Sequence, residues 1–140
     1  MTTSDEAVQN KQLIQRIFVG LAKGDGRLFV QSMAEDFRWT LIGTTAWSKT
    51  YVGKEAIMRE VIAPLQMVLQ QGPRLVAQRL IAEHDFVVVQ ARGDNLTKAG
   101  ERYDNTYCMV FRLEQGRMLE LTEYADTELV ARVLGAPVRE

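Results

Sequence analysis

The sequence has little of what disulfides, metal sites and membrane spans require. It contains one cysteine and one histidine in 140 residues, so an intrachain disulfide is impossible and a His/Cys zinc site is not expected. Its longest apolar runs, such as residues 86–89, are far shorter than the roughly 20 residues that cross a bilayer. Residues 1–6 show neither the basic nor the apolar segment of a secretory signal. We therefore expect a cytoplasmic protein without contact with a membrane.

The sequence also lacks a large excess of one charge and lacks nucleotide-binding loops. Seventeen Lys and Arg residues face eighteen Asp and Glu residues, which gives a net charge of −1 and no basic surface for nucleic acid. The glycine-rich phosphate loops and the Gly-x-Ser-x-Gly elbow of serine hydrolases are absent. We expect neither a nucleic acid partner nor a cofactor.

What is present is the periodicity of one α+β domain, residues 1–140. Apolar residues at positions 14, 17, 18 and 21 predict a first helix. A second helix is predicted at about 27–34, and a third that begins at 53–55 and kinks or restarts at Pro64. Alternation predicts strands at 37–42, 74–82, 86–95, 103–113 and 118–125, and residues 127–134 form a last helix. Because strands cluster in the second half, a wound βαβ sheet is disfavoured.

Charged side chains gather at the ends of the later strands. Arg92 and Asp94 end one run, and Asp126 ends the last. If these runs pair as neighbours, we expect the three side chains to point towards one mouth of the sheet. Two readings stay open for the carboxylates: Asp126 also fits the N-cap of the last helix, and Asp94 a turn residue.

The order of short motifs resembles the NTF2-like superfamily, in particular its SnoaL-like branch of polyketide cyclases and ketosteroid-isomerase-related proteins. The segments that carry the resemblance are the Gly24-Asp25 turn, Trp39, residues 51–57, residues 100–107, Phe111-Arg112, Gly116-Arg117 and residues 123–127. It implies a cone: a curved, mostly antiparallel sheet wrapped by three helices of the N-terminal half plus a short C-terminal helix. It also implies an apolar pocket at the open end and a homodimer through the outer sheet face, where we expect Leu119 and Leu121.

Within this superfamily, Arg92, Asp94 and Asp126 are similar to the arginine and two aspartates of limonene-epoxide hydrolase. That resemblance implies one aspartate that activates water, one that protonates the epoxide, and an arginine that holds both. The chain departs from the pattern because Trp39 and Leu41 stand where the hydrolase orients its water with polar side chains. No tyrosine precedes Tyr51, which disfavours the oxyanion tyrosine of ketosteroid isomerases.

The resemblance implies a cofactor-free lyase, isomerase or hydrolase that acts on a small apolar, oxygenated molecule. In this hypothesis Asp126 is the general acid/base, Arg92 orients it, and Asp94 is a possible second acid. The residues expected to line the pocket are Trp39, Trp47, Tyr51, Asn105, Tyr107, Met109 and Tyr124. Two alternatives remain: a non-catalytic protein that binds a lipid-like, terpenoid or aromatic molecule, and a dimeric scaffold whose pocket is filled by side chains.

Overall fold

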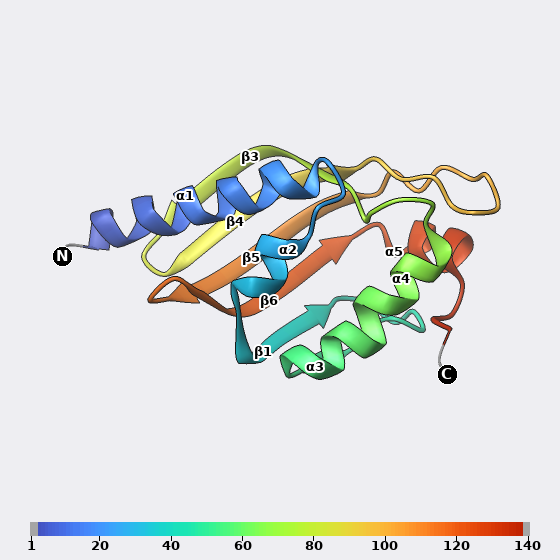
Figure 1. Ribbon diagram of the computed structural model, residues 1–140, viewed down its shortest axis with the longest axis horizontal. Coiled ribbons are helices and arrows are strands. Elements are labelled where there is room, and N and C mark those ends of the chain that lie inside the picture. Colours follow the sequence, from blue (N-terminus) through green and yellow to red (C-terminus); the bar gives the residue numbers. More distant parts are fainter. Residues whose placement is uncertain (1–2, 139–140) are drawn as a thin grey trace.

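A single curved, open sheet of six strands forms the centre of the fold (Figure 1). The computed structural model describes residues 3–138. The strands are β1 (Met33–Leu41), β2 (Thr50–Val52), β3 (Leu75–Glu83), β4 (Phe86–Gly93), β5 (Thr106–Glu114) and β6 (Arg117–Ala125). They lie in the order β2-β1-β6-β5-β4-β3, and β1 runs parallel to β6 while the other neighbours are antiparallel. The predicted α+β class with a mostly antiparallel sheet is confirmed.

The helices cover the inner face of this sheet. The first, α1 (Thr3–Leu21), lies along β3 and β4 (Figure 1). Its apolar stripe at positions 14, 17, 18 and 21 is at most 4% exposed, as the helical spacing predicts. A short α2 (Arg27–Gln31) leads into β1. In the part of the chain that the structure describes, no helix is long and apolar enough to span a membrane.

The third predicted helix is one continuous run of three segments. It consists of α3 (Lys54–Ile57), η1 (Met58–Ile62) and α4 (Ala63–Val68), of which η1 is π-helical. Pro64 has no N–H to donate to the preceding turn. A π-helical turn immediately before it accommodates that missing bond, so the predicted kink takes the form of a widened turn. The run begins beside β1, whose Trp39 is buried.

Strand pairing decides which side chains face the helices. Across β4, β5 and β6, Ala91 lies opposite Tyr107, and Tyr107 lies opposite Ala125. Directly paired residues share a face, so these three point to the inner side. The neighbouring positions, including Arg92 and Tyr124, point outward. The expected sharing of a pocket face by Tyr107 and Tyr124 is therefore wrong.

A bulge changes the alternation in β6. The register between β5 and β6 shifts after Arg112, so Met118 and Leu121 are both buried although they are three positions apart. The expected outward position of Leu121 is wrong for this reason. The outer face still carries exposed apolar side chains, such as Phe86 at 42% and Tyr124 at 48%. A homodimer through this face stays a prediction.

Candidate active site

A cavity of about 120 Å³ lies between the inner face of the sheet and the helices. Apolar and aromatic side chains from several elements form its wall, among them Phe29, Trp39, Trp47 and Met109. The last helical segment covers one side: α5 (Thr127–Leu129) and η2 (Val130–Leu134) follow β6 and contribute lining residues. The indole N–H of Trp47 donates to the carbonyl of Gly135 (2.7 Å) and so anchors the end of this segment. The cavity argues against the filled-pocket alternative.

Glu123 places a carboxyl group in this wall. It lies on β6 opposite Met109 and is the one carboxyl residue among the described residues that line the cavity. The residue is half-buried: one side of it faces the cavity, and protein surrounds it on the other sides. This loss of water disfavours the charged form and raises the pKa of Glu123 to about 7. A carboxyl that titrates near neutral pH can both accept and return a proton.

The indole N–H of Trp39 acts on this carboxyl. Trp39 is 5% exposed, and its Nε1 has no hydrogen-bond partner of good geometry among the described residues. Its N–H nevertheless lies close enough to interact with Glu123 and to lower the pKa of that carboxyl, against the larger effect of burial. An N–H donor and a carboxyl acceptor thus lie side by side in an apolar wall.

Two phenol groups extend the polar part of the site. The side-chain amide of buried Asn105 donates to Tyr103 Oη (3.0 Å), and Tyr103 in turn interacts with Tyr107. Both tyrosines line the cavity. Burial raises the pKa of each phenol, and the nearby charge of Glu123 raises it further. Both hydroxyls therefore stay protonated at neutral pH.

Asn105 also ties the ends of β5 and β6 together. It is 0% exposed, and its amide donates to the backbone carbonyl of Asp126 (3.1 Å). Its side-chain oxygen accepts from the backbone N–H groups of Thr106 (2.7 Å) and Asp126 (3.1 Å). Asn105 thus supports the cavity from behind the wall, as does Tyr51, whose hydroxyl donates to the carbonyl of Trp47 (2.7 Å). Neither lines the cavity directly, whereas the other expected residues Trp39, Trp47, Tyr107 and Met109 do.

The charged residues expected at the mouth do not meet in this cavity, and none of the three lines it. Arg92 points outward from β4 and is exposed. Asp126 is the N-cap of α5: its Oδ1 accepts from the backbone N–H groups of Glu128 (3.1 Å) and Leu129 (3.2 Å). The cavity lies on the inner face of the sheet, whereas Arg92 faces the outer side, so the strand ends do not bring these side chains to the cavity.

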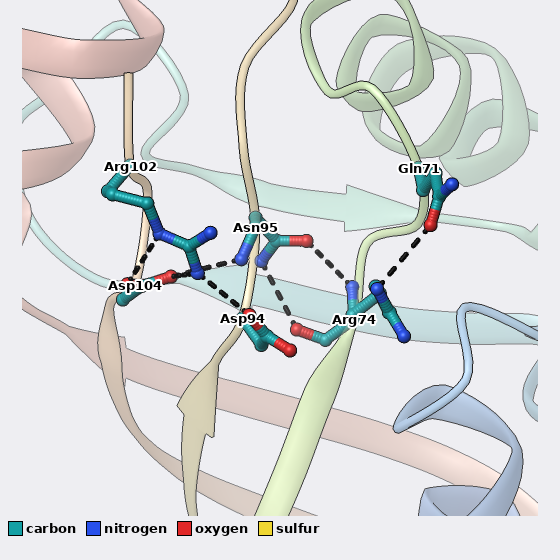
Figure 2. Close-up of polar contacts among 6 residues, drawn as sticks. All are labelled: Gln71, Arg74, Asp94, Asn95, Arg102 and Asp104. Atoms are coloured by element: carbon teal, nitrogen blue, oxygen red, sulfur yellow. Dashed lines mark hydrogen bonds and ion pairs between the residues drawn. The ribbon is translucent and has the colours of Figure 1, made fainter. Parts of the chain in front are cut away.

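Asp94 belongs to a separate ion-pair cluster (Figure 2). Its carboxylate pairs with Arg102 (2.7 Å), which also bonds Asp104 (2.7 Å). Beside them, Asn95 is 2% exposed and binds the backbone of Arg74 on both sides, accepting from its N–H (2.8 Å) and donating to its carbonyl (3.2 Å). The cluster fastens the segment before β3 to the end of β4, so its role in this structure is to hold the loop at the cavity.

The sequence contained a signal for Glu123 that the strand-end argument missed. Leu121, Glu123 and Ala125 alternate along β6, and the first of these is 1% exposed. Because side chains two positions apart on a strand share a face, a carboxylate two positions from a core residue is expected on the buried face. In residues 3–138, no three His, Cys, Asp or Glu side chains gather as a metal site would require.

The fold agrees with what the chain is similar to. The model of the SnoaL-like domain matches residues 14–121, so the chain belongs to the SnoaL-like family. No curated protein is significantly similar to it.

Many solved structures are similar to this fold, and three of them illustrate the range. An NTF2-like protein of unknown function from Burkholderia pseudomallei K96243 is 19% identical, with a TM-score of 0.77 over 97% of this chain and 100% of that one. A proposed SnoaL-like polyketide cyclase from Jannaschia sp. CCS1 is 21% identical (TM-score 0.68; 94% and 95% covered). A proposed isomerase from Bacillus subtilis is 16% identical (TM-score 0.76; both chains fully covered).

Proposed function

We propose that the protein is a cofactor-free acid–base enzyme, an isomerase or lyase of the SnoaL-like type, with Glu123 as its general acid and base. The observation that carries this proposal is a carboxyl in the wall of an apolar cavity, whose pKa burial raises to about 7. Near that pH the group exists in both forms, which suits it to removing a proton and giving it back.

The proposed step moves a proton on a small oxygenated molecule. The Glu123 carboxylate removes a proton from a carbon next to a carbonyl, and the C–H electron pair moves into the adjoining C–C bond to give an enolate. The N–H of Trp39, in the cavity wall, donates to the enolate oxygen. Donors placed in a water-poor site stabilise such charge strongly. Glu123 then returns the proton to another carbon. Alternatively, the enolate carbon attacks a second carbonyl, whose π electron pair moves to its oxygen, and Glu123 gives the proton to the resulting alkoxide.

One pocket carboxyl favours proton transfer over epoxide hydrolysis. The partial resemblance to limonene-epoxide hydrolase requires two carboxylates with an arginine between them. Here Arg92 and Asp94 lie outside the cavity, and Asp94 is paired with Arg102. Glu123 therefore takes the acid/base role that the sequence argument gave to Asp126.

Hydrogen–deuterium exchange into a panel of cyclic ketones tests the proposal. In D₂O at pH 7.5, the protein should accelerate deuterium uptake next to the carbonyl of cyclohexanone or cyclohex-2-enone, followed by NMR. Replacing Glu123 by Gln should lower the accelerated rate about 10²- to 10⁴-fold, the usual contribution of a general base. The matched control, Asp126→Asn, keeps an oxygen for the helix cap and should retain the rate. Full exchange by Glu123→Gln, or an equal loss in Asp126→Asn, would refute the assignment.

A binding protein without catalysis is the second candidate. It is favoured by the aromatic character of the wall, to which Trp39, Trp47 and Phe29 contribute. Ligands identified by native mass spectrometry and recovered unchanged after incubation, together with no exchange above background, would support this candidate over the enzyme.

A further inference from the structure

The charge of the cavity wall restricts what it can hold. Of the described residues that line it, none is a lysine, an arginine or a histidine, and Glu123 is the one carboxyl. A ligand with a carboxylate or phosphate group would bring a second negative charge beside Glu123 without a cation to balance it. An ammonium group would lose its hydration on entering the cavity, and the one carboxyl that could balance its charge has a raised pKa and is only partly ionised near neutral pH. The wall therefore favours an uncharged ligand.

The size of the cavity restricts the ligand further. Its volume is about 120 Å³, close to the roughly 150 Å³ of an engineered apolar cavity that holds one benzene molecule. Phe29, Met109 and Val61 form apolar parts of the wall, which suits a hydrocarbon ring. The buried part of the ligand is thus about one six-membered ring.

Most polar groups in the wall already have partners. Ser48 Oγ bonds Thr45 Oγ1 (2.9 Å), and Tyr103 accepts from Asn105 (3.0 Å). The carboxyl of Glu123 and the indole N–H of Trp39 are different: the two residues are diagonal neighbours on the paired strands β6 and β1, and the N–H has no bond of good geometry within residues 3–138. One strong acceptor and one donor are therefore left for a ligand at the same point of the wall.

We propose that the substrate is an uncharged, single-ring compound with a hydroxyl group, as in an alcohol, a phenol or an enol. The hydroxyl donates to Glu123 and accepts from the N–H of Trp39. A hydroxyl does both at one oxygen, whereas a ketone or an ether oxygen only accepts. As a statement about the substrate this rests on the proposed acid–base function, since the enol is the protonated form of the enolate in that step. Trp39 is the residue that recognises the hydroxyl oxygen.

Isothermal titration calorimetry at pH 8 with four one-ring probes tests the recognition. Phenol offers both hydrogen bonds, anisole is its methyl ether without a donor, benzoate is an anion, and benzylamine is a cation at this pH. Phenol should bind about tenfold more tightly than anisole, as expected for one hydrogen bond to a charged group, and more tightly than either charged probe. Equal affinity for phenol and anisole, tighter binding of benzoate or benzylamine, or no binding of any probe would overturn the proposal.

A pair of tryptophan variants locates the donor. Phenol and anisole both carry an oxygen that can accept from Trp39, whereas toluene has none. Trp39→Phe removes the N–H and should bring the phenol-to-toluene and anisole-to-toluene affinity ratios down about threefold or more. The control Trp47→Phe removes an indole of the same wall whose N–H is bound to Gly135 (2.7 Å), so all three affinities should fall together and the ratios should stay. Unchanged ratios in Trp39→Phe overturn the role of Trp39. If circular dichroism shows that this variant is unfolded, Glu123→Leu decides: it should abolish the preference for phenol.

Binding and exchange separate the two proposals. If phenol is preferred while Glu123→Gln retains full deuterium exchange, the acid–base role fails and the hydroxyl recognition stands as a binding property. If Glu123→Gln loses exchange while anisole binds as well as phenol, the hydroxyl recognition is wrong and the acid–base role stands.

Discussion

Trp39 and Glu123 meet in the wall of the cavity from two neighbouring parallel strands. In the pairing of β1 with β6, Leu41 lies opposite Glu123 and Trp39 opposite Leu121, so the indole and the carboxyl are diagonal neighbours on the inner face. Strands β1 and β6 stand far apart in the sequence, and their pairing brings together the donor and the acceptor of the proposed site. The properties of this pair lead to the first two predictions.

The stability of the protein should depend on the ionisation of Glu123. The pKa of this carboxyl is raised from 4.5 to about 7 by folding. Between these values the folded state holds a proton that the unfolded chain has released, so stability falls as pH rises through the window. The loss is at most about 3 kcal/mol for this shift. Urea denaturation at pH 5 and pH 8 measures it.

Glu123→Gln provides the comparison for this measurement. The amide resembles the neutral carboxyl, so the variant should match the wild type at pH 5 and exceed its stability at pH 8. The exposed Glu114→Gln serves as a control for the loss of a surface charge and should follow the wild type at both values. A wild-type protein that gains stability relative to Glu123→Gln between pH 5 and pH 8 would contradict the prediction.

Trp39→Phe should raise the pKa of Glu123. The indole N–H favours the charged carboxylate and lowers its pKa, and phenylalanine offers no such donor. A carbon-detected NMR titration of the Glu123 carboxyl should therefore give a value above that of the wild type. Trp47→Phe should leave it unchanged, because the Trp47 indole is bound to Gly135. A lower pKa in Trp39→Phe would show that the indole acts through burial alone.

The helices and strands could be predicted from the sequence, whereas the face of the sheet that points to the cavity could not. Helical spacing and alternation placed the first helix and five of the strands, because each depends on local periodicity. They did not show β2 at residues 50–52, which is short and pairs only with β1. The choice of inner face in β4 depended on whether Phe86 or Val87 is buried, and both are apolar. In the structure Val87 is 0% exposed and Phe86 42%.

A similar ambiguity misplaced the carboxyl in β6. Alternation counted from Met118 puts Glu120 on the buried face, whereas alternation counted from Leu121 puts Glu123 there. A bulge between Met118 and Glu120 shifts the register, so only the second count holds. A one-residue shift sends each side chain to the other face, and its position depends on contacts across the sheet that periodicity does not contain. The buried face of β5 could be predicted, because Tyr107, Met109 and Phe111 alternate without interruption and are all buried.

Asn105 should be one of the most sensitive polar positions. Its side chain makes four hydrogen bonds, to Tyr103, Thr106 and the backbone of Asp126, and it is 0% exposed. Asn105→Ala leaves several buried groups without partners, at about 1–3 kcal/mol each where no water replaces the amide. We expect a loss of about 3 kcal/mol in the free energy of unfolding, measured by urea denaturation.

Gln90→Ala is the matched control for this amide. Gln90 lies on the exposed outer face of β4, so its loss should change stability by less than about 0.5 kcal/mol. Equal effects of the two substitutions would mean that the hydrogen bonds of Asn105 do not hold the ends of β5 and β6 together.

The cluster at the end of β4 should divide into a sensitive and an insensitive part (Figure 2). Arg102 and Asp94 are each 53% exposed, and water and salt screen such pairs. Arg102→Ala should therefore cost less than about 1 kcal/mol. Asn95 is 2% exposed and bonds both backbone groups of Arg74, so Asn95→Ala should cost about 2 kcal/mol or more. Because Asn95 also lines the cavity, this variant should weaken phenol binding, whereas Arg102→Ala should not. Thermal melts and the calorimetric titration check both effects, and a larger loss of stability in Arg102→Ala than in Asn95→Ala would reverse this assignment.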